Sequence, residues 1–132
     1  MTARARAQPY HHGDLRNALL NAARAILEKK GLQGLSLRAV AREAGVSHAA
    51  PYRHFPNHEA LLVELAVEGF RELRAEIATA ALAPGAVQNR IVNLGGAYMR
   101  FVARHPALAH LMFGSHFANR AKFAELEPQR GR

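Results

Sequence analysis

Apolar residues recur every three or four positions along most of this chain, which is the period of amphipathic helices. The pattern predicts a first helix from Asp14 to Lys30, with Asp14 as its N-cap and Gly31 just beyond its end. The same pattern predicts further helices at about 58–81, at 86–103, from Pro106 to Phe113 and, more weakly, at 116–126. Because the sequence contains no alternating strand pattern, the predicted fold class is all-α.

Two shorter helices are predicted between residues 36 and 55, where the chain changes direction at Gly45. Ser36 is placed to cap the first of them, and Gly45 supplies the left-handed conformation that ends it. Ser47 is expected to cap a second helix from about His48 to Arg53, with an irregular start because Pro51 lacks an N–H group. This succession predicts a helix-turn-helix, whose second helix fits the major groove of DNA.

The candidate DNA contacts are small or basic residues on these two helices. Ala49 and Ala50 are placed to touch a thymine methyl group, and His48 to bond either a base edge or a phosphate. Ser36 and Arg38 suit phosphate contacts, the alternatives being a plain helix cap and a solvated charge. The remaining candidate DNA contacts on these two helices are Ser47, Arg53 and His54.

The charge balance favours a polyanionic partner. The chain has 18 Lys and Arg residues against 10 Asp and Glu, a formal net charge of +8. Residues 1–59 carry +5 of this excess and residues 60–132 carry +3. A solvated arginine-rich surface is the alternative, and the acidic stripe of Glu64, Glu68, Glu72 and Glu76 is expected to be a solvated helix face.

Other features of the composition restrict the class of protein. There is no cysteine, which excludes disulfides and thiolate metal sites. No secretory signal or run of membrane-spanning length is found, so a soluble, cytoplasmic protein is expected. The sequence also lacks a Gly-rich phosphate loop and a nucleophile elbow, so neither an enzyme nor a cofactor is expected.

The segment from Leu35 to Leu65 resembles the DNA-binding domain of the TetR family of transcription regulators. The resemblance rests on Gly45-Val46-Ser47, on Tyr52-x-x-Phe55 and on Glu59-x-Leu61. It implies that Tyr52 contacts the DNA backbone and that Phe55 packs beneath the helix at 58–81. His58 stands where the family usually has a phosphate-directed lysine. With the preceding helix, the DNA-binding domain is expected to cover residues 13–73, with the helix-turn-helix at 36–55.

A weaker resemblance, over residues 97–114, is to the C-terminal regulatory domain of one TetR subgroup. It implies a helical region at 86–126 for effector binding and dimerisation. The chain ends before the two final helices through which the family dimerises, so the protein is truncated, dimerises in another way or is a degenerate member. Four residues either line an effector pocket or pack in a core, namely Tyr98, Phe101, Met112 and Phe113.

The predicted function is that of an effector-responsive repressor, which binds a pseudo-palindromic operator in double-stranded DNA as a homodimer. Two alternatives remain at this point. One is a metal-responsive regulator based on the eight histidines, although they show no clean ligand spacing on one uninterrupted helix. The other is a basic helical interaction module without sequence-specific DNA binding. An N-terminal arm carrying Arg4 and Arg6 either enters a minor groove or has no role.

Overall fold

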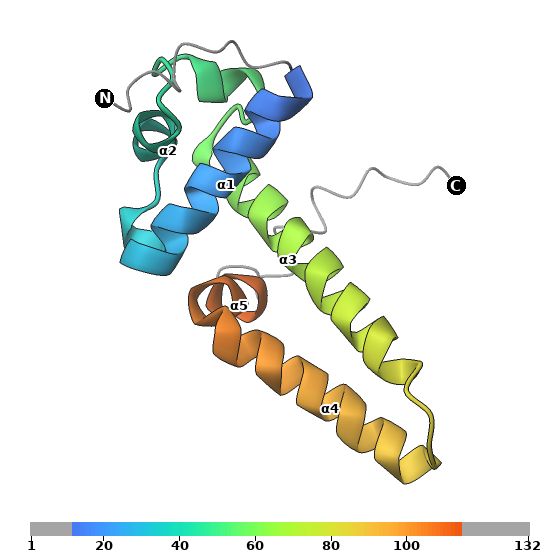
Figure 1. Cartoon of the computed structure of the whole chain (residues 1–132). Coiled ribbons are helices and arrows are strands. Elements are labelled where there is room, and N and C mark those ends of the chain that lie inside the picture. Colours follow the sequence, from blue (N-terminus) through green and yellow to red (C-terminus); the bar gives the residue numbers. More distant parts are fainter. Residues whose placement is uncertain (1–11, 115–132) are drawn as a thin grey trace, which may run out of the picture. The chain divides into compact units, whose positions relative to one another are not determined.

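The computed structural model describes residues 12–114, with side chains from residue 14 onward, and this part of the chain contains helices and no strand (Figure 1). The all-α fold class is therefore confirmed. The chain divides into two compact units, the first ending at Glu68 and the second beginning at Gly69. The helical segments are α1 (His12–Lys30), η2 (Leu32–Gly34), α2 (Leu37–Ala44), η3 (Ala50–Arg53), α3 (His58–Ala81), α4 (Val87–Arg104) and α5 (Pro106–Phe113). The predicted arm at 1–11 and helix at 116–126 lie outside the described residues.

The first unit is built on α1, which packs against α2. The apolar positions of α1 that repeat at helical spacing are buried, and their periodicity explains why this segment is a helix. The helix begins at His12, so the expected N-cap Asp14 lies instead in the first turn, where its charge favours the positive end of the helix dipole. The buried side chains of α1 are Leu19, Leu20, Ala22, Ala23, Ile26 and Leu27.

The turn after α2 has the predicted geometry. The Ser36 Oγ accepts a hydrogen bond from the Ala39 N–H at 3.0 Å and so caps α2. Gly45 has φ 73°, and its N–H donates to the Arg42 carbonyl. The Val46 N–H donates to the Ala41 carbonyl at 3.0 Å, which completes a Schellman motif. A left-handed residue is required here, and glycine adopts that conformation without a Cβ penalty.

The second helix of the motif differs from the prediction. His48 and Ala49 form a turn, and only Ala50–Arg53 is helical, as a 3-10 segment. Its backbone hydrogen bonds connect an N–H to the carbonyl three residues earlier, for example from the Tyr52 N–H to the Ala49 carbonyl at 3.2 Å. The expected side-chain cap from Ser47 is absent at this segment, because the N-cap residue is Ala49. Pro51 explains the difference, since it has no N–H with which to form an early α-helical bond.

The acidic stripe on α3 is more than a solvated face. Within the first unit Glu64 forms an ion pair with Arg16, and Glu68 forms one with Arg24 at 3.2 Å. Both pairs are partly buried and join α3 to α1. The α3 N-terminus is capped by Asn57, whose Oδ1 accepts from the Ala60 N–H at 2.8 Å. The predicted bounds of this helix, 58–81, agree with the structure.

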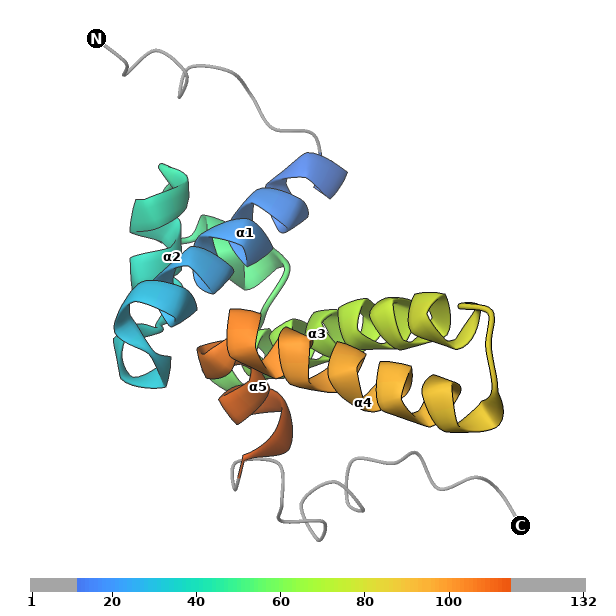
Figure 2. The same ribbon diagram turned by 60° about the horizontal axis from the view of Figure 1, so that its bottom comes forward.

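The second unit consists of α3 from Gly69 onward, α4 and α5. Figures 1 and 2 show this part of α3 running alongside α4, with the connection at residues 82–86. Helix α5 packs on α4. Gly69 allows α5 to approach α3, because a Cβ there would lie 2.5 Å from the Met112 sulfur. The buried side chains of this unit are Leu73, Ala97, Phe101, Leu108, Ala109, Leu111 and Met112.

Candidate nucleic-acid interface

Three side chains from the helix-turn-helix surround one hollow on the first unit. Arg38 comes from α2, His48 from the turn that follows, and Tyr52 from η3, and together they line a hollow of about 230 Å³. Tyr52 is 56% exposed, a large fraction for an aromatic side chain. A guanidinium, an imidazole and a phenol are all hydrogen-bond donors that bind phosphate oxygens. The hollow is therefore a candidate contact site for the DNA backbone.

Five further predicted residues are exposed around this hollow or near it in the sequence. They are Ser36, Ser47, Ala49, Arg53 and His58. The Ser36 oxygen is used as the α2 cap, but a hydroxyl that accepts one bond retains its proton for donation to another group. Ser36 can thus both cap α2 and donate to a phosphate.

Two predicted contacts do not belong to this exposed surface. Ala50 is only 8% exposed, so its methyl group is not available to a thymine. His54 is half-buried, and its Nε2 is enclosed without a hydrogen-bond partner among the described residues. Ala50 is the first residue of η3 and His54 is its C-cap, and the side chains of both are less exposed than those of Tyr52 and Arg53 between them. We leave Ala50 and His54 out of the candidate surface.

The exposed surface is supported from below by Phe55, whose side chain is fully buried. The Phe55 N–H donates to the Pro51 carbonyl at 2.8 Å, which joins the ring to the end of η3. The Arg16 guanidinium lies over the ring, 5.7 Å from its centroid, and also pairs with Glu64. Sequence reasoning missed this role of Arg16. The sequence shows Arg16 and the acidic stripe separately, but nothing in it specifies that the two segments lie side by side.

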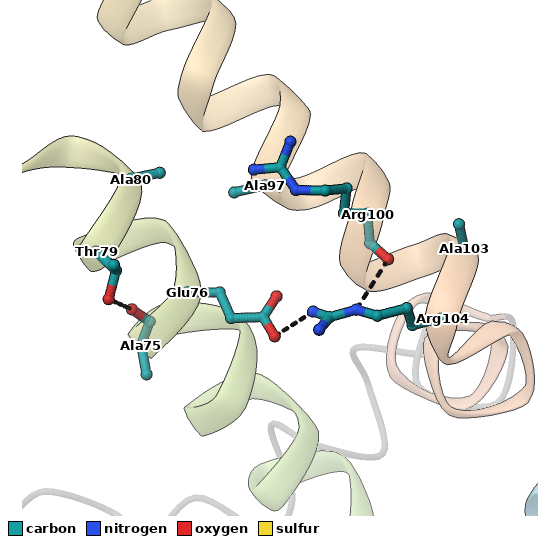
Figure 3. Close-up of a pocket in the computed structure, with 8 residues that line it drawn as sticks. All are labelled: Ala75, Glu76, Thr79, Ala80, Ala97, Arg100, Ala103 and Arg104. Carbon is teal, nitrogen blue, oxygen red and sulfur yellow. Dashed lines mark hydrogen bonds and ion pairs between the residues drawn. The ribbon is translucent and has the colours of Figure 1, made fainter. Parts of the chain in front are cut away.

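A second hollow, of about 640 Å³, lies on the second unit between α3 and α4 (Figure 3). Glu76 and Arg104 form an ion pair in it, and the Arg100 side chain extends beside Ala97 toward α3. The remaining lining residues are Ala75, Thr79, Ala80 and Ala103.

The four residues expected to line an effector pocket lie elsewhere. Phe101 and Met112 are buried in the core of the second unit. Tyr98 and Phe113 are partly exposed and their rings are 5.8 Å apart, while Phe113 also packs edge-to-face on Phe70 at 5.3 Å. None of the four lines the hollow between α3 and α4. Their observed role in the described structure is packing.

Residues 12–114 contain neither a clustered metal site nor a membrane-spanning helix. In that range no group of three or more His, Asp or Glu side chains is placed to hold a metal ion. Likewise, no helix there is both long enough and apolar enough to cross a membrane.

Comparison with known proteins identifies the family. The model of the bacterial regulatory proteins of the tetR family matches residues 19–65, which run from α1 through the helix-turn-helix into α3. The chain is also 35% identical over 97 residues to the HTH-type transcriptional repressor KstR of Mycolicibacterium smegmatis. The chain belongs to the TetR family. The TetR family is regulatory rather than catalytic.

The similarity to TetR-family proteins covers most of this chain but only part of each relative. The match to KstR of M. smegmatis covers 74% of the chain and 48% of that protein. KstR of Mycobacterium tuberculosis is 30% identical over 113 residues, which are 85% of the chain and 51% of that protein. The chain thus spans about half the length of these curated relatives.

Solved structures share the fold of this chain. A protein of unknown function from Rhodococcus sp. RHA1 is 50% identical with a TM-score of 0.73, over 83% of this chain and 57% of that one. The TetR-family regulator PfmR from Thermus thermophilus has a TM-score of 0.60 at 23% identity, over 89% of this chain and 64% of that one. The second likeness shows the shared fold.

Proposed function

We propose that this protein is a transcriptional repressor that binds an operator in double-stranded DNA through the surface around η3. The contact residues are Ser36, Arg38, Ser47, His48, Ala49, Tyr52, Arg53 and His58. Residues 13–73 form the DNA-binding domain in this proposal, and residues 86–126 the regulatory region. Both KstR relatives are named repressors, which favours repression over activation.

The observation that carries the proposal is the exposed cluster of Arg38, His48 and Tyr52. These side chains come from both helical segments of the motif and the turn between them, and they surround one hollow. Arg38 supplies charge and Tyr52 a directional donor for phosphates, which fix the register of the protein on the duplex. His48 and Ala49 lie in the exposed turn directly before η3, where a base edge or a thymine methyl is within reach of short side chains.

The repressor in this proposal is a homodimer whose two copies of η3 enter successive major grooves of an inverted repeat. A small molecule bound to the second unit would release the DNA by favouring a different conformation. The hollow between α3 and α4 is the candidate effector site, since its volume of about 640 Å³ is within the usual range for small-molecule pockets. As a DNA-binding protein it would act in the cytoplasm and carry out no catalysis.

A salt titration tests the proposal. Binding to a fluorescently labelled duplex selected by the protein is compared with binding to a random duplex of equal length, by anisotropy. At physiological salt, sequence-specific binding predicts a Kd for the selected duplex that is lower by a factor of roughly a thousand or more. For both duplexes, the logarithm of the binding constant should fall linearly with the logarithm of the salt concentration. Equal affinities for the two duplexes at every salt concentration would contradict the proposal and favour a basic interaction module.

A further inference from the structure

Segment η3 is too short to fix its own position. It is a single 3-10 turn of four residues, and Pro51 within it has no N–H group to donate. The N–H groups of His54 and Phe55 both donate to the Pro51 carbonyl, at 3.0 and 2.8 Å. The end of η3 is therefore attached to Phe55. The position of the exposed Tyr52 side chain thus depends on how firmly the buried Phe55 ring is held.

Arg16 of α1 holds this ring from one side. Its guanidinium carbon lies over the Phe55 ring, 5.7 Å from the centroid, where the negative face of the aromatic system attracts a cation. The same guanidinium forms an ion pair with Glu64 of α3 at 2.5 Å. An arginine side chain is long and has many rotamers, so the carboxylate restricts it to the place over the ring. Arg16 thus joins α1, α3 and the residue that ends η3.

A second ion pair joins the same two helices further along. Arg24 pairs with Glu68 at 3.2 Å, and its side chain is less exposed than that of Arg16, 18% against 38%. Arg24 follows Arg16 by eight residues, which is about 12 Å along α1 at about 1.5 Å per residue. The two pairs connect α1 to α3 in the same manner, and the pair at Arg16 also contacts Phe55. The chain therefore contains its own control for what the contact with Phe55 adds.

We propose that Arg16, held by Glu64, is a positioning residue for DNA binding. It fixes Phe55 and through it the presentation of Tyr52 to the duplex, and it does not itself contact the DNA. This proposal deepens the proposed function and rests on it. The other role open to a partly exposed arginine is a direct bond to a phosphate oxygen.

Replacement of Glu64 by glutamine distinguishes the two roles by the sign of its effect. The substitution removes a negative charge, and a more basic protein binds a polyanion more tightly. A phosphate-binding Arg16 would also be released from its carboxylate, so the Kd for the selected duplex would fall. A positioning Arg16 instead loses the group that holds it over Phe55, and this Kd should rise roughly fivefold. Glu68→Gln makes the same change of charge, and as the matched control it should leave the Kd unchanged or lower.

Anisotropy titrations of the full chain with the labelled duplex, repeated at several salt concentrations, provide a second readout. Arg16→Met should raise the Kd roughly tenfold and leave the slope of log Kd against log salt at the wild-type value, because no phosphate contact is lost. Loss of a direct phosphate contact would reduce this slope by about 0.9. Arg24→Met removes the same charge and the less exposed ion pair, and it should change the Kd by no more than about twofold.

A double-mutant cycle tests whether Arg16 acts through Tyr52. Arg16→Met should weaken duplex binding little further once Tyr52 has been replaced by alanine, because the side chain that it positions is then missing. Additive losses would overturn the proposal, as would tighter binding by Glu64→Gln, a reduced salt slope for Arg16→Met or an equal loss for Arg24→Met. A wild type without preference for the selected duplex contradicts the proposed function. A wild type with that preference, equalled by Arg16→Met and Glu64→Gln, contradicts the positioning role alone.

Discussion

Replacement of Phe55 by alanine tests whether this buried side chain stabilises the DNA-binding surface without being part of that surface. The Phe55 side chain is fully buried, and the Arg16 guanidinium lies 5.7 Å from the ring centroid. Loss of a buried phenylalanine costs about 3–5 kcal/mol through lost burial and the cavity that remains. Loss of the arginine contact adds about 0.5–1 kcal/mol, since Arg16 is partly exposed. This is a large share of the roughly 5–15 kcal/mol that stabilises a typical domain.

The assay is urea denaturation followed by circular dichroism at 222 nm. Phe55→Ala should strongly lower the urea concentration at the unfolding midpoint. It should also abolish duplex binding, because residue 55 is hydrogen-bonded to the Pro51 carbonyl and its loss of packing would disturb η3. Tyr52→Ala is the control three residues away, and its side chain is exposed, so the free energy of unfolding should change by only about 0.5 kcal/mol. A loss below about 1 kcal/mol for Phe55→Ala would refute the assignment of Phe55 as the support of η3.

Three smaller predictions concern the motif itself. Tyr52→Ala should weaken binding to cognate and random duplexes alike by roughly tenfold or more in anisotropy titrations, since a phosphate contact is independent of sequence; a loss confined to the cognate duplex would contradict this. His48→Ala should reduce discrimination between those duplexes by about 1–3 kcal/mol, and equal losses on both would exclude base recognition. Gly45→Ala should cost about 1–2 kcal/mol in urea denaturation, because its φ of 73° is unfavourable for alanine, and an unchanged midpoint would argue against that turn.

Periodicity and local chemistry were sufficient to predict most of the helices. The predicted 58–81 segment agrees with α3, and the predicted 86–103 segment differs from α4 by one residue at each end. The turn at Gly45 was predictable because a left-handed residue is needed there and glycine is the residue that adopts it readily. Signals of this kind act within a few residues and need no tertiary context.

The predictions that failed depended on packing between distant segments. Ala50 was expected to be exposed because it is small and near a helix start, but its side chain is buried in the core of the first unit. The glutamates of α3 were expected to face solvent because their spacing is that of a helix surface. Two of them pair with α1, whose position beside α3 is a property of the tertiary structure. Composition and spacing do not specify such partners.

Selection of bound sequences from a pool of random duplexes tests the central claim most directly, namely that the surface around η3 recognises a specific operator. The selected sequences should share an inverted repeat whose half-sites lie about one helical turn or slightly more apart. The Ala substitution at Tyr52 should deplete recovery of all sequences, and the Ala substitution at His48 should broaden the consensus. A wild-type selection that yields no enriched sequence would contradict the account.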